Sequence, residues 1–261
     1  MFQVISVVQK AQARSFWAGK VIAITGARGE LGQALIQSFR SAGAHVVGLT
    51  HSSLPESKTD LSGPHEWQQW RCGKEEELDE LLMNLDILVL NHGINPRRCE
   101  IFAGVDAALE VNALSTWRLM RRFKELCETG TNDVGQPNRT LRELWVNTSE
   151  AEFQPALSPA YEISKRLLGQ LVSLHWAAGK RKGEQCLVVR KLVLGPFRSG
   201  LNPIGLMSSR FVAARVLQLA RVGIQLIVVT PNPNTYAVMP LTELGRWLYV
   251  RLLLQANHRD L

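Results

Sequence analysis

The segment VIAITGARGELG, residues 21–32, decides the fold. Its first five residues are β-branched or apolar and predict a short buried strand. Gly26, Gly29 and Gly32 follow at three-residue spacing, and apolar residues then recur at helical period up to Phe39, with Gly43 where a helix would end. Glycines allow a tight turn and close approach of a ligand, and a helix N-terminus offers free N–H groups to an anion. The segment therefore predicts a strand, turn and helix that bind the phosphates of a dinucleotide.

Strand and helix patterns alternate along the rest of the chain. Apolar runs predict further strands at 44–49, 67–71, 86–90, 143–148, 185–194 and 224–229. Helical periods predict helices at 74–83, 105–128, 161–178, 208–222 and 241–255. This alternation is typical of an α/β protein with a doubly wound parallel sheet, the Rossmann fold, and helices on both faces. Because no linker or repeat divides the chain, we expect one domain over residues 19–261, after an arm at 1–18 packed on the outside.

Composition narrows the class of protein. The 261 residues are 46% hydrophobic, enough for one large core. A net charge of +7 and a pI near 9.5 favour anionic ligands, but the basic residues lack interleaved aromatic platforms, so nucleic acid is not expected. Four cysteines without CxxC or metal-ligand spacing indicate reduced thiols and no metal site. With no convincing signal peptide and no apolar run long enough for a membrane span, we expect a cytoplasmic location.

The end of the second predicted strand bears on the cofactor. In this fold that strand end faces the adenosine ribose, where an acidic residue would bind the free 2′-hydroxyl of NAD. The sequence there is Thr50, His51, Ser52 and Ser53, without Asp or Glu, and Arg28 lies in the nearby glycine turn. Both features favour NADP(H), with NAD(H) left as an alternative.

Further motifs follow in a recognisable order. They are Asn91-His92-Gly93 after a buried strand, Asn112 in a helix, Ser149 after the next strand, Tyr161-x-x-x-Lys165 in a helix, and Gly195-Pro196-x-x-Ser199 after another strand. Together with the glycine turn, they resemble the short-chain dehydrogenase/reductase family over about residues 19–230. The resemblance implies an NADP(H)-preferring oxidoreductase that interconverts a carbonyl and an alcohol, on a small molecule that we expect to be hydrophobic.

The resemblance also assigns roles. Tyr161 would be the general acid and base, and Lys165 would lower the pKa of its phenol from about 10 and hold the nicotinamide ribose. Asn112 would support Lys165 through a water, and Ser149 would orient the substrate oxygen. The expected cofactor contacts are Gly26, Arg28, Gly29, Glu30, Leu31, Gly32, Thr50, His51, Ser52, Cys72, Asn91, His92, Gly93, Tyr161, Lys165, Pro196 and Ser199.

Four features depart from the family pattern. Glu30 stands where a glycine usually approaches phosphate, and Cys72 stands where an Asp often lies beneath the adenine. The spacing to Tyr161 leaves two candidates for the serine position, and we favour Ser149 over Glu150 because the site needs a hydrogen-bond donor. The lid segment at 201–209 is short, which predicts an open, shallow or partner-completed pocket.

These departures keep other functions open. A non-catalytic nucleotide-binding scaffold or sensor is the main alternative, and one module of a larger membrane-linked enzyme is another. For the Leu-rich helix at 241–255 we favour docking on the substrate side, with contact to a membrane surface as the alternative, since Trp, Leu and Arg suit that boundary. By resemblance, the helices around Asn112 and after Tyr161 predict a homo-oligomer.

Overall fold

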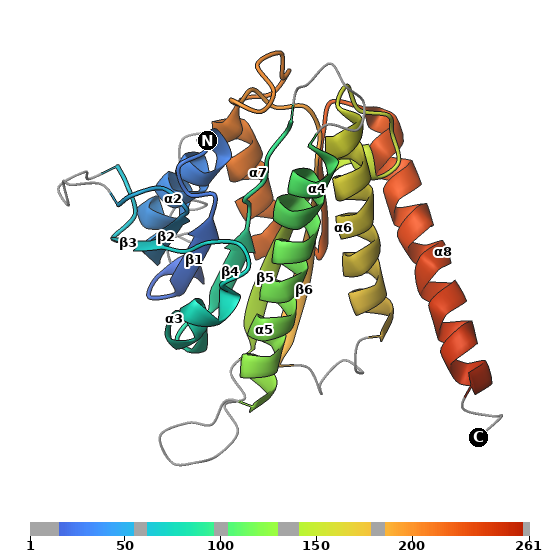
Figure 1. Cartoon of the computed structure of the whole chain (residues 1–261), viewed down its shortest axis with the longest axis horizontal. Coiled ribbons are helices and arrows are strands. Elements are labelled where there is room, and N and C mark those ends of the chain that lie inside the picture. Colours follow the sequence, from blue (N-terminus) through green and yellow to red (C-terminus); the bar gives the residue numbers. More distant parts are fainter. Residues whose placement is uncertain (1–15, 55–61, 97–103, 130–140, 179–185, 258–261) are drawn as a thin grey trace, which may run out of the picture.

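The computed structural model describes residues 16–54, 62–96, 104–129, 141–178 and 186–257, with the side chains of 253–257 left aside. Its centre is a seven-stranded parallel sheet in the order β3-β2-β1-β4-β5-β6-β7 (Figure 1). The strands are β1 (Val21–Thr25), β2 (His45–Thr50), β3 (Glu66–Gln69), β4 (Ile87–Leu90), β5 (Arg142–Ser149), β6 (Leu187–Leu194) and β7 (Leu226–Val229). The predicted doubly wound fold with helices on both faces is confirmed.

The two faces of the sheet carry separate apolar cores. On one face lie α2 (Glu30–Ser41) and α7 (Ser209–Arg221). The other face is covered by the 3-10 turn η1 (Glu75–Leu78), α3 (Asp79–Met83), α5 (Ser115–Thr129) and α6 (Pro159–Ala178). Because every strand is parallel, the loops that follow the strands meet at one edge, which lies at the top of Figure 1.

The structure refines the predicted helix at 105–128. It is built from α4 (Val105–Ala108), a π-helical turn η2 (Leu109–Leu114) and α5. The wider turn contains Asn112, and π-turns of this kind are often found at functional sites. A short 3-10 turn, η3 (Glu150–Glu152), follows β5 and connects it toward α6.

Trp17 corrects the expected arm. Residues 1–15 lie outside the described chain, but Trp17 is only 1% exposed and does not lie on the outside. Its ring meets Phe39 of α2 edge-on at 5.3 Å and Trp145 of β5 at 5.6 Å. Large aromatic rings bury much apolar area in such contacts, so Trp17 belongs to the core of the domain.

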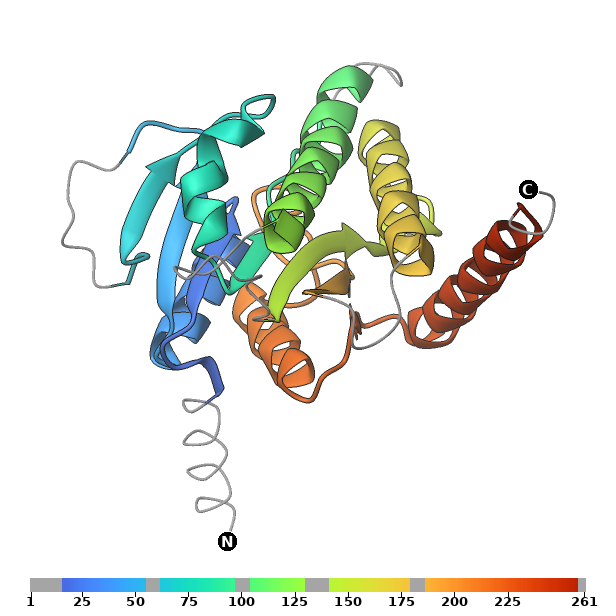
Figure 2. The same ribbon diagram turned by 90° about the horizontal axis from the view of Figure 1, so that it is seen from below.

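The C-terminal helix is longer than predicted. Helix α8 spans Pro233–Asn257 and therefore begins eight residues before the predicted start. The Asn232 side chain accepts a hydrogen bond from the Asn234 N–H at 3.0 Å, and Pro233 takes the first helical position, where a missing N–H costs nothing. Pro240 lies within the helix without ending it. Helix α8 packs against α6 and diverges from it toward the C-terminus (Figures 1 and 2).

Candidate functional site

One cavity of about 1230 Å³ opens at the carboxyl edge of the sheet. It is lined by nearly every residue that the sequence assigned to cofactor or catalysis: Gly26, Arg28, Gly29, Glu30, Leu31, Thr50, His51, Ser52, Cys72, Asn91, His92, Gly93, Ser149, Tyr161, Lys165, Pro196 and Ser199. Two predicted residues, Gly32 and Asn112, lie behind its wall. The lid residues Leu201 and Ile204 also line the cavity, and the open, shallow or partner-completed pocket stays a prediction.

The glycine turn shapes one end of the cavity. Gly26 has a φ of +62°, and a Cβ at this position would lie 2.9 Å from the carbonyl oxygen of Asn91. A Cβ at Gly32 would lie 2.3 Å from the carbonyl oxygen of Gly26, so Gly32 lets α2 pack against the turn. Gly29 caps α2 without a side-chain hydrogen bond. The turn is therefore open to an anionic group at the helix N-terminus, and these residues fit a dinucleotide pyrophosphate.

Glu30 reaches across the same end of the cavity. Its carboxylate accepts a hydrogen bond from the Gly200 N–H at 2.8 Å, in the loop after β6. From the other side, the Asn95 amide donates to the Leu201 carbonyl at 3.2 Å. The loop is thus held both to the start of α2 and to the segment after β4. A carboxylate here adds negative charge beside the expected phosphate position.

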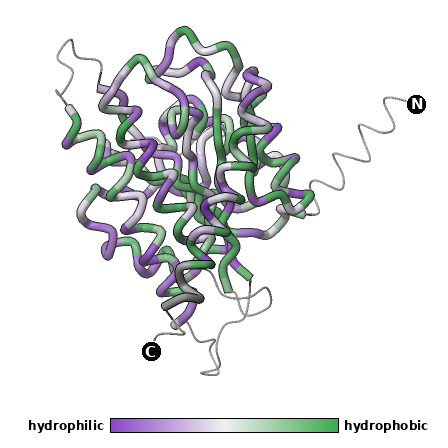
Figure 3. The backbone as a smooth tube through the Cα atoms, turned by 90° about the vertical axis from the view of Figure 1, so that its right-hand side faces the viewer, coloured by the Kyte–Doolittle hydropathy of each residue, from purple (hydrophilic) through white to green (hydrophobic). Residues whose placement is uncertain are grey.

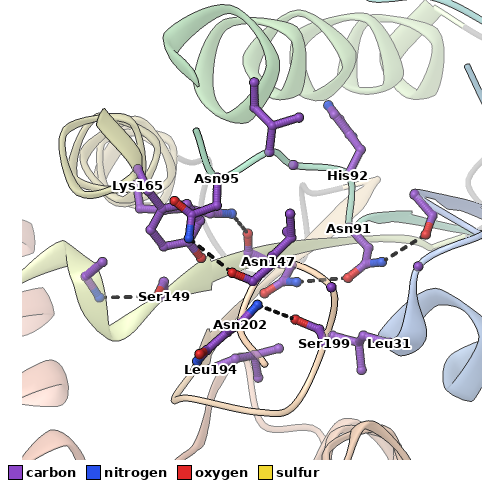
Figure 4. A pocket seen from close by; sticks show the side chains of 18 of the residues that line it. Leu31, Asn91, His92, Asn95, Asn147, Ser149, Lys165, Leu194, Ser199 and Asn202 are labelled. Atoms are coloured by element: carbon purple, nitrogen blue, oxygen red, sulfur yellow. Dashed lines mark hydrogen bonds between the residues drawn. The ribbon is translucent and has the colours of Figure 1, made fainter. Parts of the chain in front are cut away.

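Tyr161 and Lys165 of α6 both line the cavity. Figure 4 shows Lys165 close to Asn147. The Lys165 ammonium is 5.7 Å from the centre of the Tyr161 ring and donates to the Asn147 carbonyl at 3.0 Å. Burial lowers the pKa of Lys165 to about 8, with the nearby Glu152 carboxylate acting in the opposite direction. Burial raises the pKa of the Tyr161 phenol, and a hydrogen bond with Ser149 counteracts part of that rise. The expected lowering of the phenol pKa by Lys165 is not found here.

The residues after β5 separate the two candidates for the serine position. Ser149 lines the cavity beside Tyr161, and its hydroxyl accepts from the Ala151 N–H at 3.2 Å. The Glu150 carboxylate instead accepts hydrogen bonds from the hydroxyls of Thr230 and Thr235. Both residues line the cavity, but the Glu150 carboxylate is engaged on the side of β7 and α8, and the expected role of Ser149 stays a prediction.

Asn112 holds two segments together from within the π-helical turn. Its amide oxygen accepts from the Ile94 N–H at 2.7 Å, and its amide nitrogen donates to the Ile94 carbonyl at 2.9 Å and to the Ser164 hydroxyl at 2.8 Å. These contacts fix the segment after β4 against α6, one residue from Lys165. The side chain of Asn112 is thus a support for the site.

Sequence reasoning missed Asn147 and Thr25. The Asn147 amide donates to the Asn91 side-chain oxygen at 2.9 Å, while its own carbonyl receives Lys165 (Figure 4). The Thr25 hydroxyl receives the Asn91 N–H at 2.8 Å. These bonds link the glycine turn to the lysine through the ends of three neighbouring strands. A polar residue at the carboxyl end of a buried strand was the available signal for Asn147.

Arg28 of the glycine turn lies beside the end of β2. Arg28 donates to the Ser53 carbonyl at 2.6 Å, and its guanidinium lies 5.6 Å from the centre of the Trp67 ring. Burial raises the pKa of the Cys72 thiol. Burial also lowers the pKa of His92 to about 3, so this imidazole is neutral at physiological pH. Arg28 therefore supplies the positive charge at the end of β2.

Comparisons with known proteins agree on the type of protein. No protein-family profile matches the chain. A monoglucosyldiacylglycerol epimerase of Synechocystis sp. is 41% identical over 237 residues, which are 89% of this chain and 54% of that protein. An uncharacterised short-chain type dehydrogenase/reductase of Sinorhizobium fredii is 32% identical over 127 residues, or 44% of this chain and 22% of that protein. The chain thus spans about half the length, or less, of these relatives.

Solved structures share the fold at low sequence identity. A short-chain dehydrogenase from Burkholderia cenocepacia in complex with NADP has a TM-score of 0.68 and 18% identity, over 91% of this chain and 98% of that one. A short-chain dehydrogenase from Sphingobium yanoikuyae in complex with NADPH has a TM-score of 0.64 and 15% identity, over 93% and 96%. At this identity the likeness concerns the fold.

Proposed function

Because this chain belongs to the short-chain dehydrogenase/reductase family, we propose that it binds NADP(H) and interconverts an alcohol and a carbonyl. The observation that carries the proposal is the convergence of Tyr161, Lys165 and Ser149 on the cavity that begins at the glycine turn. When bound, NADP(H) supplies hydride acceptance and donation at a carbinol carbon. Arg28, with no acidic neighbour at the end of β2, supports the 2′-phosphorylated cofactor.

The side chains supply proton transfer and orientation. Ser149 donates a hydrogen bond to the substrate oxygen, and Tyr161 gives that oxygen a proton in the reducing direction or takes one in the oxidising direction. Because burial raises the pKa of Tyr161, the phenol is protonated at neutral pH and suits carbonyl reduction there. Alcohol oxidation needs the phenolate, so its rate rises with pH. The Lys165 ammonium lies 5.7 Å from the centre of the Tyr161 ring, but the buried phenol keeps a raised pKa.

We propose a glycolipid as the substrate class, by analogy with the epimerase relative. Epimerisation of a glucosyl carbinol fits the same machinery. The carbinol loses a hydride from carbon and a proton from oxygen, and the resulting ketone regains both, with the hydride delivered to the opposite face. The two half-reactions balance, so no cofactor is consumed. A cavity of about 1230 Å³ has room for a dinucleotide and part of a sugar head group.

The surroundings of the site lead to two accessory proposals. The chain covers 54% of the epimerase relative, and its being one module of a larger membrane-linked enzyme stays a proposal. No helix in the described part of the chain is long and apolar enough to cross a bilayer. The homo-oligomer stays a prediction. Since α8 already covers one side of α6, a second copy would have to use α5 and the remaining side of α6.

Replacing Tyr161 tests the catalytic proposal. We expect Tyr161→Phe to lower turnover by at least about a hundredfold, because it removes the proton donor, while NADPH binding stays within about twofold of the original. Turnover would be followed with soluble aldehydes and ketones and with a glucosyl lipid in detergent, and binding by NADPH fluorescence.

Tyr236→Phe is the matched control, since Tyr236 bonds the Thr230 backbone outside the cavity. Unchanged turnover in Tyr161→Phe would refute the proposal. Tight NADPH binding with no Tyr161-dependent turnover on any substrate would favour the scaffold or sensor, whose support is the carboxylate of Glu30 in the cofactor cavity.

A further inference from the structure

Helix α8 is oriented with its polar residues toward the protein. Its buried positions include Thr235 and Glu243, with Met239 between them. The outward positions Leu241, Leu244, Leu248 and Leu252 are between 46% and 67% exposed. A surface helix in water normally has the opposite arrangement. Figure 3 looks at the molecule from the side on which α8 lies, and Figure 2 shows the end of the helix standing away from the body.

Buried polar contacts hold α8 in this orientation. The Lys191 ammonium on β6 is fully buried and binds the Glu243 carboxylate at 2.8 Å and the Glu152 carboxylate at 2.6 Å. Arg246 donates to the Ser173 hydroxyl at 3.1 Å and to Glu243 at 3.2 Å. If α8 turned these partners outward, the fully buried Lys191 would lose one of its two carboxylates and keep Glu152. The leucines of α8 are therefore held on the outside by the structure of the domain.

The inward side of α8 packs close to a loop at the mouth of the cavity. Met239 of α8 packs with Val193, Val228 and Phe153. Phe153 precedes the loop at 154–158, which lines the cavity, and Leu157 in that loop is 95% exposed. These buried contacts bring the first half of α8 close to the loop at the cavity mouth, and the exposed leucines lie on the outer side of the same helix. Two arginines accompany them, and Arg251 lies 5.1 Å from the centre of the exposed Trp247 ring.

We propose that this face, formed by Leu157 and the outward leucines of α8, docks on a lipid bilayer that contains anionic lipid. Leucine with tryptophan at an interface and arginine beside it is the composition that binds such a surface, and the chain carries a net charge of +7. The role that we give to docking rests on the proposed function, since a glycolipid head group would reach the cavity from the same bilayer surface. Docking itself requires neither cofactor nor substrate.

Vesicle co-sedimentation without cofactor or substrate tests docking separately from catalysis. The chain should bind vesicles of phosphatidylcholine mixed with phosphatidylglycerol more tightly than vesicles of phosphatidylcholine alone. The double variant Leu244→Glu/Leu248→Glu should weaken binding by more than about tenfold, since it removes two apolar side chains from the contact. Met83→Glu is the matched control, because Met83 is 47% exposed on α3, away from α8.

If something other than a bilayer covers this face, the same measurements give different results. Absence of vesicle binding, or equal binding by Leu244→Glu/Leu248→Glu, would overturn the proposal. A dimer in light scattering that the double variant dissolves would assign the face to a second copy and also overturn it. Reduction of a soluble carbonyl should be unchanged in the double variant, so loss of docking and loss of catalysis are read independently.

Discussion

Helices α2 and α8 are held to the same sheet by opposite kinds of contact. The inward face of α2 is apolar, with Leu35, Ile36 and Phe39 at most 1% exposed. The inward face of α8 carries Glu243 and Arg246, and its leucines face outward. Apolar burial contributes most of the stability of a domain, whereas a buried ion pair is offset by the loss of hydration of both charges. The position of α2 is therefore set by burial, and that of α8 by which partners its charges can reach.

The two halves of the molecule therefore differ in how their parts of the site are supported. The β1–α2 half builds the cofactor turn on a rigid apolar core. In the β5–α8 half, the turn after Ser149 contains Glu150, which accepts a hydrogen bond from Thr235 of α8, and Glu152, which accepts one from Lys191. Lys191 also donates to Glu243 of α8. The turn that presents Ser149 is thus connected to the helix that we assign to the bilayer. Changes in either half should have different effects.

The largest effect is expected for Lys191→Met. It would leave Glu152 buried without its cation and Glu243 with Arg246 alone. We expect the free energy of unfolding to fall by up to about 5 kcal/mol. Urea unfolding followed by tryptophan fluorescence would measure it. The triple variant Lys191→Met/Glu152→Gln/Glu243→Gln should regain most of the loss, because no buried charge is then left unpaired. A stable single variant would contradict the buried network.

Replacing a large apolar side chain by alanine should lower the free energy of unfolding more in α2 than in α8. Phe39→Ala empties a fully buried site on α2 and should cost about 3–5 kcal/mol. Leu248→Ala on α8 removes a side chain that is 46% exposed and should change the stability in solution by no more than about 0.5 kcal/mol. Urea unfolding of both variants at one protein concentration makes the comparison. Equal losses would mean that the leucine face is already covered in solution.

The contrast also explains what could be predicted from the sequence. The period of apolar residues gave α2 correctly, because burial of that face determines its position. The same kind of period placed the start of α8 at Leu241, while the structural signal was Asn232 followed by Pro233. The partners of Lys191 lie 39 and 52 residues away, and no local pattern can pair them.

The candidate site shows the same limit. Most of the predicted residues follow strands of the sheet. They line one cavity because parallel strands all end at one edge. Spacing alone left both Ser149 and Glu150 as candidates for the serine position. The contacts that engage Glu150 come from the hydroxyls of Thr230 and Thr235, which are far away in the sequence. Asn147 was missed because its role arises from contacts with two other strand-end segments. Chemistry at a strand end is predictable, whereas contacts across the fold are not.

Glu30 gives the smallest expected effect and addresses the cofactor half alone. Its carboxylate accepts a hydrogen bond from Gly200 and so helps to hold the loop after β6 over the cavity. Its negative charge lies at the start of α2 and repels a cofactor phosphate bound there. Glu30→Gln keeps an acceptor for Gly200 and removes the charge, and should tighten NADPH binding about three- to tenfold at low salt. Glu30→Asp keeps the charge but shortens the side chain, and should not tighten it. Fluorescence titration at two salt concentrations separates these effects, because screening weakens the repulsion. Equal NADPH affinity in all three proteins would mean that the carboxylate turns away from the phosphates when the cofactor binds.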